Sequence, residues 1–270
     1  MSNPSKGFVI VATNKPAFYS SAMNLVESIL DHYEDARITF FTSHPEWIDN
    51  RAKDYCENIL DCPEHIRGKL YGMANSPYDI TFYVDADSVC EHEDIVNVWD
   101  ELGDNDLSFV RLTKDKVAAA SFVEVDAPIE GTDKVIDLVL CGGVCLYDMR
   151  KPIIRDFMKD WWEMFLVQEE WYNHYRGRGY KPTSTPWWHE GTPITMLRWD
   201  QFTLWWMTNE MDKYKDLKIG KFEDNYRWNW FTSFKFNQTG SNAGKHRLVN
   251  NPPIIVHHSA TLQKDKDFRV

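Results

Sequence analysis

The chain has few cysteines, and they are not arranged as metal ligands or as a disulfide framework. There are five, an odd number, and none forms a C-x-x-C pair; they stand at positions 56, 62, 90, 141 and 145. This spacing excludes a zinc module and a complete set of disulfides, and it favours a reducing compartment. The only apolar run near the amino terminus, Phe8–Ala12, is too short for a signal peptide or a membrane span. We therefore expect a cytoplasmic protein with no membrane span.

The chain also lacks runs of basic residues, internal repeats and low-complexity tracts. The chain contains 30 Lys and Arg and 41 Asp and Glu, which gives a formal net charge of −11. This negative charge disfavours a broad nucleic-acid-binding surface. The composition, 43% hydrophobic and 26% charged, excludes a disordered chain and a membrane protein. A length of 270 residues lies near the upper limit for one hydrophobic core.

Tryptophan, by contrast, is abundant. Ten of the twelve tryptophans lie between Trp161 and Trp230. Because large aromatic side chains are most often buried, those within helical patterns are expected to pack in the core. These are Trp161, Trp162, Trp205 and Trp206.

Apolar runs alternate with helical patterns along the first 84 residues. The runs predict buried strands at Phe8–Ala12, Arg37–Thr42 and Asp79–Val84. Helices are predicted from Ser20 or Ser21 to about Tyr33, over Pro45–Glu57 and over Pro63–Asn75. This alternation is typical of a parallel, doubly wound sheet, which binds ligands beyond the carboxyl ends of its strands.

The second half of the chain predicts a mixed sheet. Strands are expected at Leu107–Arg111 and Leu138–Tyr147, and a short buried strand at Ile254–His258. Helices are expected over Pro152–Tyr175 and from Thr195 to about Met211. No linker separates independent domains, so we expect a single domain over residues 1–270.

Two acidic residues, Asp85 and Asp87, come directly after the apolar strand that ends at Val84. Two other D-x-D triplets, at 104–106 and 265–267, follow no buried strand. Two neighbouring carboxylates repel each other unless they share a proton or a divalent cation, and Mg²⁺ or Mn²⁺ held there can also bind a diphosphate. The alternative is a solvated or capping turn, which is common where strands end.

A pair of histidines, His257 and His258, ends the last apolar run. If the sheet is wound as predicted, this run also ends near the ligand-binding edge. Imidazole is a good ligand for Mn²⁺ beside carboxylates. Side chains alternate along a strand, so only one of the two rings can face a given site.

With these residues in view, the sequence resembles the metal-dependent GT-A glycosyltransferases, in particular the retaining group that contains glycogenin and the bacterial lipopolysaccharide galactosyltransferases. The motifs follow the family order over residues 7–262. Val9–Thr13 is similar to the first strand, whose end receives the nucleobase. Lys69–Asp79 followed by Phe82–Asp87 is similar to the helix, turn and D-x-D strand. The strand Leu140–Tyr147 carries Cys141 where asparagine is usual.

The resemblance implies an α/β fold, a Rossmann-like mixed sheet flanked by helices with an aromatic-rich subregion on the acceptor side. Residues 7–110 would form the half that binds the nucleotide sugar, and residues 138–262 the acceptor-side half with the closing strand. The implied activity is metal-dependent transfer of a sugar, with retention of the anomeric configuration, from a nucleoside diphosphate sugar to a hydroxyl acceptor, which can be a carbohydrate.

The resemblance also implies particular site residues. The expected ligands of Mn²⁺ or Mg²⁺ are Asp85, Asp87 and His257. The residues expected to contact the nucleoside diphosphate sugar are Ala12, Thr13, Asn14, Lys69, Asp85 and Lys264.

Catalytic and acceptor residues are expected in the second half of the chain. The pair Asp200 and Gln201 matches the family's D-Q motif near the anomeric carbon, and Glu190 or Asp200 would serve as the base if the enzyme inverts. Three tryptophans, whose faces complement sugar rings, are candidate acceptor contacts. They are Trp187, Trp188 and Trp228.

Two alternatives remain open. A non-catalytic nucleotide-sugar-binding module would keep the fold without the reaction. An enzyme of the same fold acting on a modified nucleic-acid base would need a local basic patch despite the net charge of −11. The residues available for that patch are Arg176, Arg178, Lys181 and Arg198.

Overall fold

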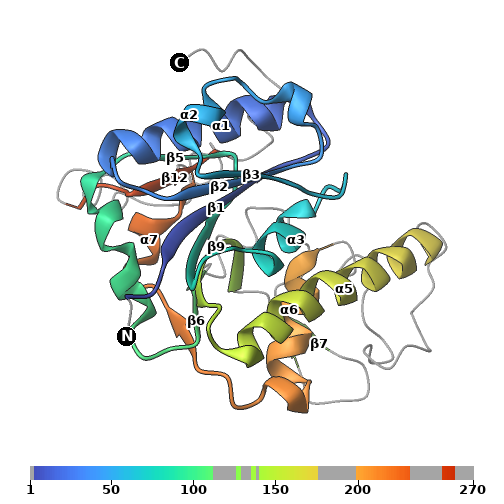
Figure 1. Cartoon of the computed structure of the whole chain (residues 1–270). Coiled ribbons are helices and arrows are strands. Elements are labelled where there is room, and N and C mark those ends of the chain that lie inside the picture. Colours follow the sequence, from blue (N-terminus) through green and yellow to red (C-terminus); the bar gives the residue numbers. More distant parts are fainter. Residues whose placement is uncertain are drawn as a thin grey trace.

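The structure is a computed structural model, and it describes residues 3–111, 126–128, 135–137, 140–175, 199–231 and 251–258. Within these residues the chain forms a twisted sheet with helices on both faces (Figure 1). This is the α/β architecture with a mixed sheet that the sequence predicts.

The main sheet contains seven strands among the described residues, in the order β10-β6-β9-β4-β1-β2-β3. Strands β1, β2, β3 and β4 run parallel, whereas β9 is antiparallel to both of its neighbours, β4 and β6. The strands are β1 (Lys6–Ala12), β2 (Ile38–Thr42), β3 (Asn58–Asp61), β4 (Ile80–Val84), β6 (Leu107–Arg111), β9 (Leu140–Asp148) and β10 (Ile219–Lys221).

Two smaller sheets accompany the main one. Strands β5 (Ser88–Cys90), β11 (Trp230–Phe231) and β12 (Ile255–His257) form a three-stranded sheet, with β12 in the middle. Strands β7 (Asp126–Pro128) and β8 (Val135–Asp137) pair with each other. The closing strand is buried, as expected, and belongs to the three-stranded sheet.

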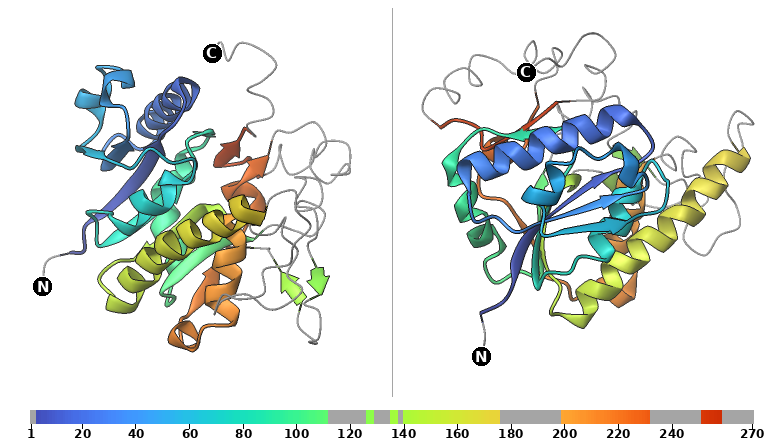
Figure 2. Two further views of the ribbon diagram at one scale, coloured as in Figure 1. Left: turned by 90° about the vertical axis from the view of Figure 1, so that its right-hand side faces the viewer. Right: turned by 45° about the horizontal axis from the view of Figure 1, so that its top comes forward.

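Helices cover both faces of the main sheet (Figures 1 and 2). On one face lie α1 (Pro16–His32), the 3₁₀ helix η2 (Glu93–Leu102) and α7 (Asn225–Trp228), and on the other α3 (Gly68–Ala74), α5 (Pro152–Tyr175) and α6 (Asp200–Asn209). Short helical segments elsewhere are η1 (Pro45–Trp47), α2 (Ala52–Tyr55) and η4 (Asp212–Tyr214). None of the helices in the described ranges combines the length and the apolar composition needed to cross a membrane.

Two apolar cores result from the alternation of side chains along buried strands. In β1, Phe8 and Ile10 pack beneath α1, whereas Val9 and Val11 pack on the opposite side with α3. A strand covered on both faces has no polar side to present to water, which explains the continuous apolar runs of the sequence.

The aromatic-rich segments form the core on the α5 and α6 side. Trp161, Trp205 and Trp206 are buried, and Trp162 packs against them. The prediction that the helical tryptophans serve packing is therefore confirmed.

The predicted helix Pro45–Glu57 is wrong in extent. The structure has η1 and α2 there, separated by a turn in which the Asp49 carboxylate accepts a hydrogen bond from the backbone N–H of Arg51 at 2.9 Å. Aspartate favours such turns over a continuous helix. The strand β3 was not predicted, because this half-exposed edge strand begins and ends with polar residues.

We expect Trp161→Ala to lower the free energy of unfolding by roughly 3–5 kcal/mol, because the ring is fully buried and its loss leaves a large cavity. Trp47→Ala is the matched control, since that side chain is 37% exposed, and it should cost less than about 1 kcal/mol. Urea denaturation of both variants measures the difference. A loss in Trp161→Ala as small as the one expected for Trp47→Ala would show that the α5 core tolerates the cavity.

Candidate functional site

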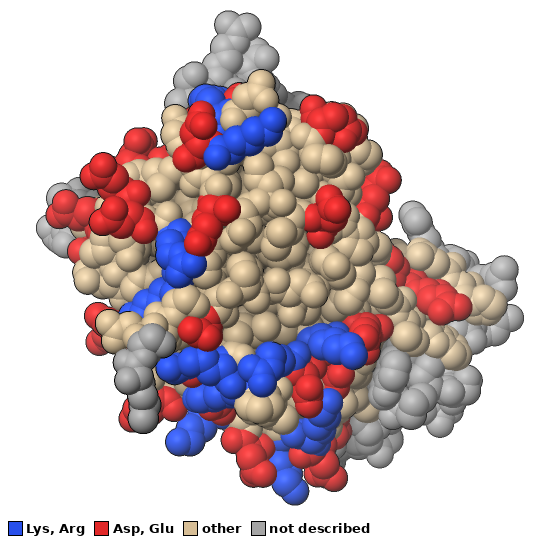
Figure 3. Space-filling model, viewed as in Figure 1, with Lys and Arg blue, Asp and Glu red and all other residues tan. Residues whose placement is uncertain are grey.

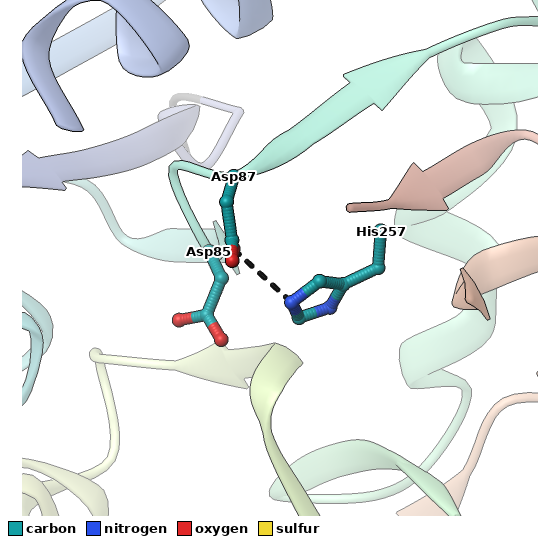
Figure 4. Close-up of side chains that lie close together, drawn as sticks. All are labelled: Asp85, Asp87 and His257. Carbon is teal, nitrogen blue, oxygen red and sulfur yellow. Dashed lines mark ion pairs between the residues drawn. The ribbon is translucent and has the colours of Figure 1, made fainter. Parts of the chain in front are cut away.

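The three predicted metal ligands, Asp85, Asp87 and His257, come together at the carboxyl end of β4. Each offers one ligand atom, and these three atoms lie within 4.8 Å of one another. Figure 4 shows the two carboxylates extending from the same turn, with the His257 ring facing them from β12. Residues that are 170 positions apart in the sequence thus form one cluster, as the sequence predicts.

Strand pairing brings His257 to this position. Strand β12 lies antiparallel to β5, and its register places His257 opposite Ser88, the residue after Asp87. The backbone N–H of His258 donates to the Asp87 carbonyl oxygen at 2.8 Å. Because side chains alternate along a strand, this register turns the ring of His257, rather than that of His258, toward the carboxylates.

The Asp87 carboxylate and the His257 ring form a short ion pair. Oδ1 of Asp87 lies 3.1 Å from Nε2 of His257, and both side chains are largely buried. Burial alone would raise the pKa of Asp87, but the neighbouring imidazole outweighs it and lowers that pKa. Burial likewise lowers the pKa of His257, and the Asp87 carboxylate more than offsets it, so the pKa is raised.

Asp85 is held through one of its two carboxylate oxygens. Oδ1 accepts hydrogen bonds from the Tyr83 hydroxyl at 2.7 Å and from Lys69 Nζ at 3.2 Å. Burial and the adjacent carboxylate keep the pKa of Tyr83 well above its usual range, so its hydroxyl remains a donor. Among the described residues no donor contacts Oδ2, which leaves that oxygen for a ligand.

Glycine at position 143 leaves the space that Asp85 occupies. A Cβ on Gly143 would stand well inside contact distance of Asp85 Oδ2. The backbone N–H of Asp85 also donates to the Gly143 carbonyl at 2.8 Å. The close approach of β9 to the acidic turn therefore depends on the missing side chain.

The cluster suits a divalent cation of the Mg²⁺ or Mn²⁺ type. Two carboxylates and one imidazole are a donor set that such ions accept. The two carboxylates repel each other, and a cation bound between them would offset that repulsion. The open oxygen of Asp85 and the inward-facing Nε2 of His257 fit this requirement.

A second buried carboxylate, Asp200, lies beside this cluster at the first residue of α6. It is 1% exposed, and neither of its oxygens has a hydrogen-bond partner among the described residues. Two cations lie nearby: Arg67 Nε is 3.3 Å from Oδ1, and Lys69 Nζ is 3.4 Å from Oδ2. The indole N–H of Trp161 donates to the Asp200 carbonyl at 3.1 Å and thus fixes the start of the helix.

Lys69 joins the two acidic groups. Its ammonium contacts Asp85, Asp200 and the Gly142 carbonyl, the last at 3.2 Å. Burial opposes its positive charge, but the carboxylates of Asp200 and Asp85 outweigh that effect and raise the pKa of Lys69. Lys69, which the sequence predicts as a nucleotide contact, is thus a cation that lies between two acids.

The remaining described site residues fall into different surroundings. Ala12 and Thr13 are buried at the end of β1, where the Thr13 hydroxyl donates to the His65 carbonyl at 2.6 Å. Asn14 adopts the left-handed conformation with φ of 73°, which asparagine tolerates better than most residues. Gln201 is 9% exposed and follows Asp200 in α6.

The expectation that Trp228 forms an acceptor surface is wrong. The side chain is 4% exposed and packs against Phe82 and Phe222, and its Nε1 donates to Glu101 at 2.8 Å. With both ring faces covered by the core, it offers no surface for a sugar ring.

Several predicted residues lie outside the described part of the chain. They are Glu190, Lys264, Trp187 and Trp188, together with the basic residues Arg176, Arg178, Lys181 and Arg198. On the face shown in Figure 3, acidic and basic residues are interspersed, and Lys and Arg gather with acids in the lower part of the view.

Three contributors to the site escape sequence reasoning: Arg67, Tyr83 and Asn229. Tyr83 stands within an apolar strand and reads as a core residue. Arg67 lies just before α3 and Asn229 just after α7, and in both cases the partner is a residue more than 25 positions away. The one sequence feature that could have indicated any of the three is the basic residue Arg67, two positions before Lys69.

We expect Lys69→Met to lower the free energy of unfolding by roughly 3 kcal/mol at neutral pH, because it removes a buried cation from between two carboxylates. Lys159→Met is the control, since that side chain is 68% exposed and pairs with the exposed Glu163, and it should change stability by less than about 0.5 kcal/mol. Urea denaturation measures both. Equal effects would contradict the role of Lys69 in charge compensation.

Comparison with known proteins gives a match in fold and none in sequence. No protein-family model matches the chain, and no curated protein matches it. Among solved structures it is similar to the glycosyltransferase GlyE of Streptococcus pneumoniae TIGR4, with a TM-score of 0.51 and 14% identity over 99% of this chain and 58% of that chain. It is also similar to the bifunctional glycosyltransferase WbbM, with a TM-score of 0.52 and 13% identity over 95% of this chain and 46% of that chain.

A third similar structure is the galactosyltransferase LgtC in complex with donor and acceptor sugar analogues, at a TM-score of 0.46 and 15% identity over 93% of this chain and 86% of that chain. This chain spans about half the length of GlyE and WbbM. At these identities the likeness establishes the architecture. The chain has the fold of GT-A glycosyltransferases, as its motif series predicts.

Proposed function

We propose that the protein is a metal-dependent glycosyltransferase that moves a sugar from a nucleoside diphosphate sugar to a hydroxyl acceptor. The observation that carries this proposal is the cluster of Asp85, Asp87 and His257 at the carboxyl end of β4 in a GT-A fold. In open α/β sheets, ligands bind at this edge. GlyE and WbbM are named as glycosyltransferases, and their names specify neither the donor nor the acceptor.

Asp85 Oδ2, one oxygen of Asp87 and Nε2 of His257 would hold the cation. When bound, Mn²⁺ or Mg²⁺ would neutralise the negative charge that develops on the departing diphosphate. Lys69 keeps a permanent positive charge beside this position and, with Lys264, would support the diphosphate. The end of β1, at Ala12, Thr13 and Asn14, would receive the nucleobase.

Asp200 would act on the sugar itself. Its carboxylate is fixed by the start of α6 and by the cations of Arg67 and Lys69, so it presents a negative charge in one position. An oxocarbenium-like centre is stabilised by a carboxylate held close to it. With Asp200 and Gln201 beneath the anomeric carbon, its bond to the diphosphate would break and the acceptor hydroxyl would bond to it on that same face. The departing diphosphate oxygen would take the hydroxyl proton, and the configuration would be retained.

The first test is a panel of nucleotide sugars with Mn²⁺, in which the released nucleoside diphosphate is measured. Asp87→Ala should lower metal-dependent turnover at least about 100-fold, because a ligand is lost. Asp104→Ala is the matched control, since it alters an exposed acid in a second D-x-D triplet, and it should leave turnover unchanged. Full turnover in Asp87→Ala would refute the metal assignment. Nucleotide binding without any turnover would favour a non-catalytic binding module.

The second test concerns the stereochemistry. Asp200→Asn keeps the shape of the side chain but removes its charge, and we expect turnover to fall roughly 100- to 1000-fold. The product anomer, followed by NMR, should match that of the donor in the wild type and in the residual reaction of the variant. An inverted product would instead require a general base on the acceptor, a role for Asp200 or Glu190.

A further inference from the structure

Asn229 is buried behind the metal-ligand cluster, at the residue that follows α7. Its side chain is fully buried, and two of its polar contacts lie on either side of it. Nδ2 donates to the Cys141 sulfur at 3.2 Å, and Oδ1 lies 3.1 Å from Nδ1 of His257. The amide thus joins the first residues of β9 to the last residue of β12.

In the structure this amide turns its NH₂ group toward the Cys141 sulfur and its carbonyl oxygen toward His257. Burial raises the pKa of Cys141 to about 11, so the sulfur remains a neutral thiol that can accept a hydrogen bond. An amide whose NH₂ group faces the sulfur must turn its carbonyl oxygen toward His257. A carbonyl oxygen only accepts, so Nδ1 of the imidazole must carry a proton.

The proton on Nδ1 decides what the opposite nitrogen can do. With Nδ1–H directed at Asn229, Nε2, which pairs with Asp87, is the nitrogen that can give up its proton and bind a metal. Metal-ligating histidines commonly donate their other ring N–H to an oxygen acceptor in this way. A ring held on both sides also keeps its plane while a ligand enters or leaves.

We propose that Asn229, which also contacts Cys141, is a positioning residue that fixes the tautomer and the ring plane of His257. This inference rests on the proposed function, in which His257 is a metal ligand. Asn229 touches neither Asp85 nor Asp87 by any contact found in the described structure, so its effect passes through the imidazole. The contact with Asn229 also gives a role to Cys141, which stands where the family that this sequence resembles has asparagine.

Mn²⁺ affinity, measured by calorimetry on the full-length protein without donor, is the first test. Asn229→Leu keeps the branching at Cγ but removes the acceptor, and it should weaken Mn²⁺ binding roughly 10- to 100-fold. Asn229→Asp keeps an acceptor toward Nδ1–H and should bind Mn²⁺ at least as tightly as the wild type. Asn251→Leu is the matched control, since it removes an amide that contacts Asp224 in the adjacent loop, and it should leave Mn²⁺ affinity unchanged.

Unchanged Mn²⁺ affinity in a folded Asn229→Leu variant would overturn the inference. If that variant does not fold, Asn229→Asp decides: weakened binding there would also overturn it, because the acceptor is still present.

The second test reads His257 directly, in metal-free protein carrying ¹⁵N-labelled histidine. The wild type should show a Nδ1–H resonance for His257 that exchanges slowly with solvent and persists in Asn229→Asp. In Asn229→Leu its exchange should be faster. A wild-type ring without Nδ1–H, or an unchanged resonance in Asn229→Leu, would overturn the inference. A wild type that shows this resonance but binds no Mn²⁺ would refute the metal part of the proposed function and leave the positioning role standing.

Discussion

Asp85, Asp87 and Asp200 place three carboxylates around one edge of the sheet, two of them in surroundings with little access to water. Three negative charges so close together would repel one another and resist burial. Lys69 lies between Asp85 and Asp200, and the imidazole of His257 pairs with Asp87. The surrounding strands and helices hold these two compensating groups, Lys69 and His257, in place.

Backbone geometry sets the distances in this arrangement. Gly143 lets β9 approach the acidic turn, and at Gly142 a Cβ would come within 3.1 Å of Asp200 Oδ2. The pairing of β12 with β5 then brings His257 in from the end of the described chain. Sites whose side chains project from paired strands and helix starts are held more precisely than sites on free loops. Strand pairing and the two glycines therefore hold the side chains of the cluster close together.

Buried and partly buried tryptophans support the same site through packing. Trp161 is fully buried in the core beneath β9, and its indole N–H holds the carbonyl of Asp200. Trp199 lies beneath the guanidinium of Arg67, 5.7 Å from the ring centroid. Large rings fill the space between α5, α6 and the sheet, so that the start of α6 cannot shift away from the acids. The aromatic residues of the described region thus act mainly through packing.

Local patterns in the sequence were sufficient for much of the fold. The apolar runs that became β1, β2, β4 and β6 are continuous because those strands are covered on both faces, and Pro152–Tyr175 is a helix over the predicted bounds. Edge elements were harder to predict. Strand β3 and the small strands β5 and β11 are short or half-exposed, so pairing with neighbours, rather than composition, makes them strands.

The sequence by itself determined that Asp85 and Asp87 end a buried strand and that a histidine ends the last one, because both facts depend on neighbouring residues. Only the tertiary structure decided that His257 rather than His258 faces the acids, since that choice is made by the register of β12 on β5. It also removed Trp228 from the site and brought in Asn229, Tyr83 and Arg67. Hydrogen bonds between residues far apart in the chain have no signature in local sequence, and the fold alone brings such partners within reach.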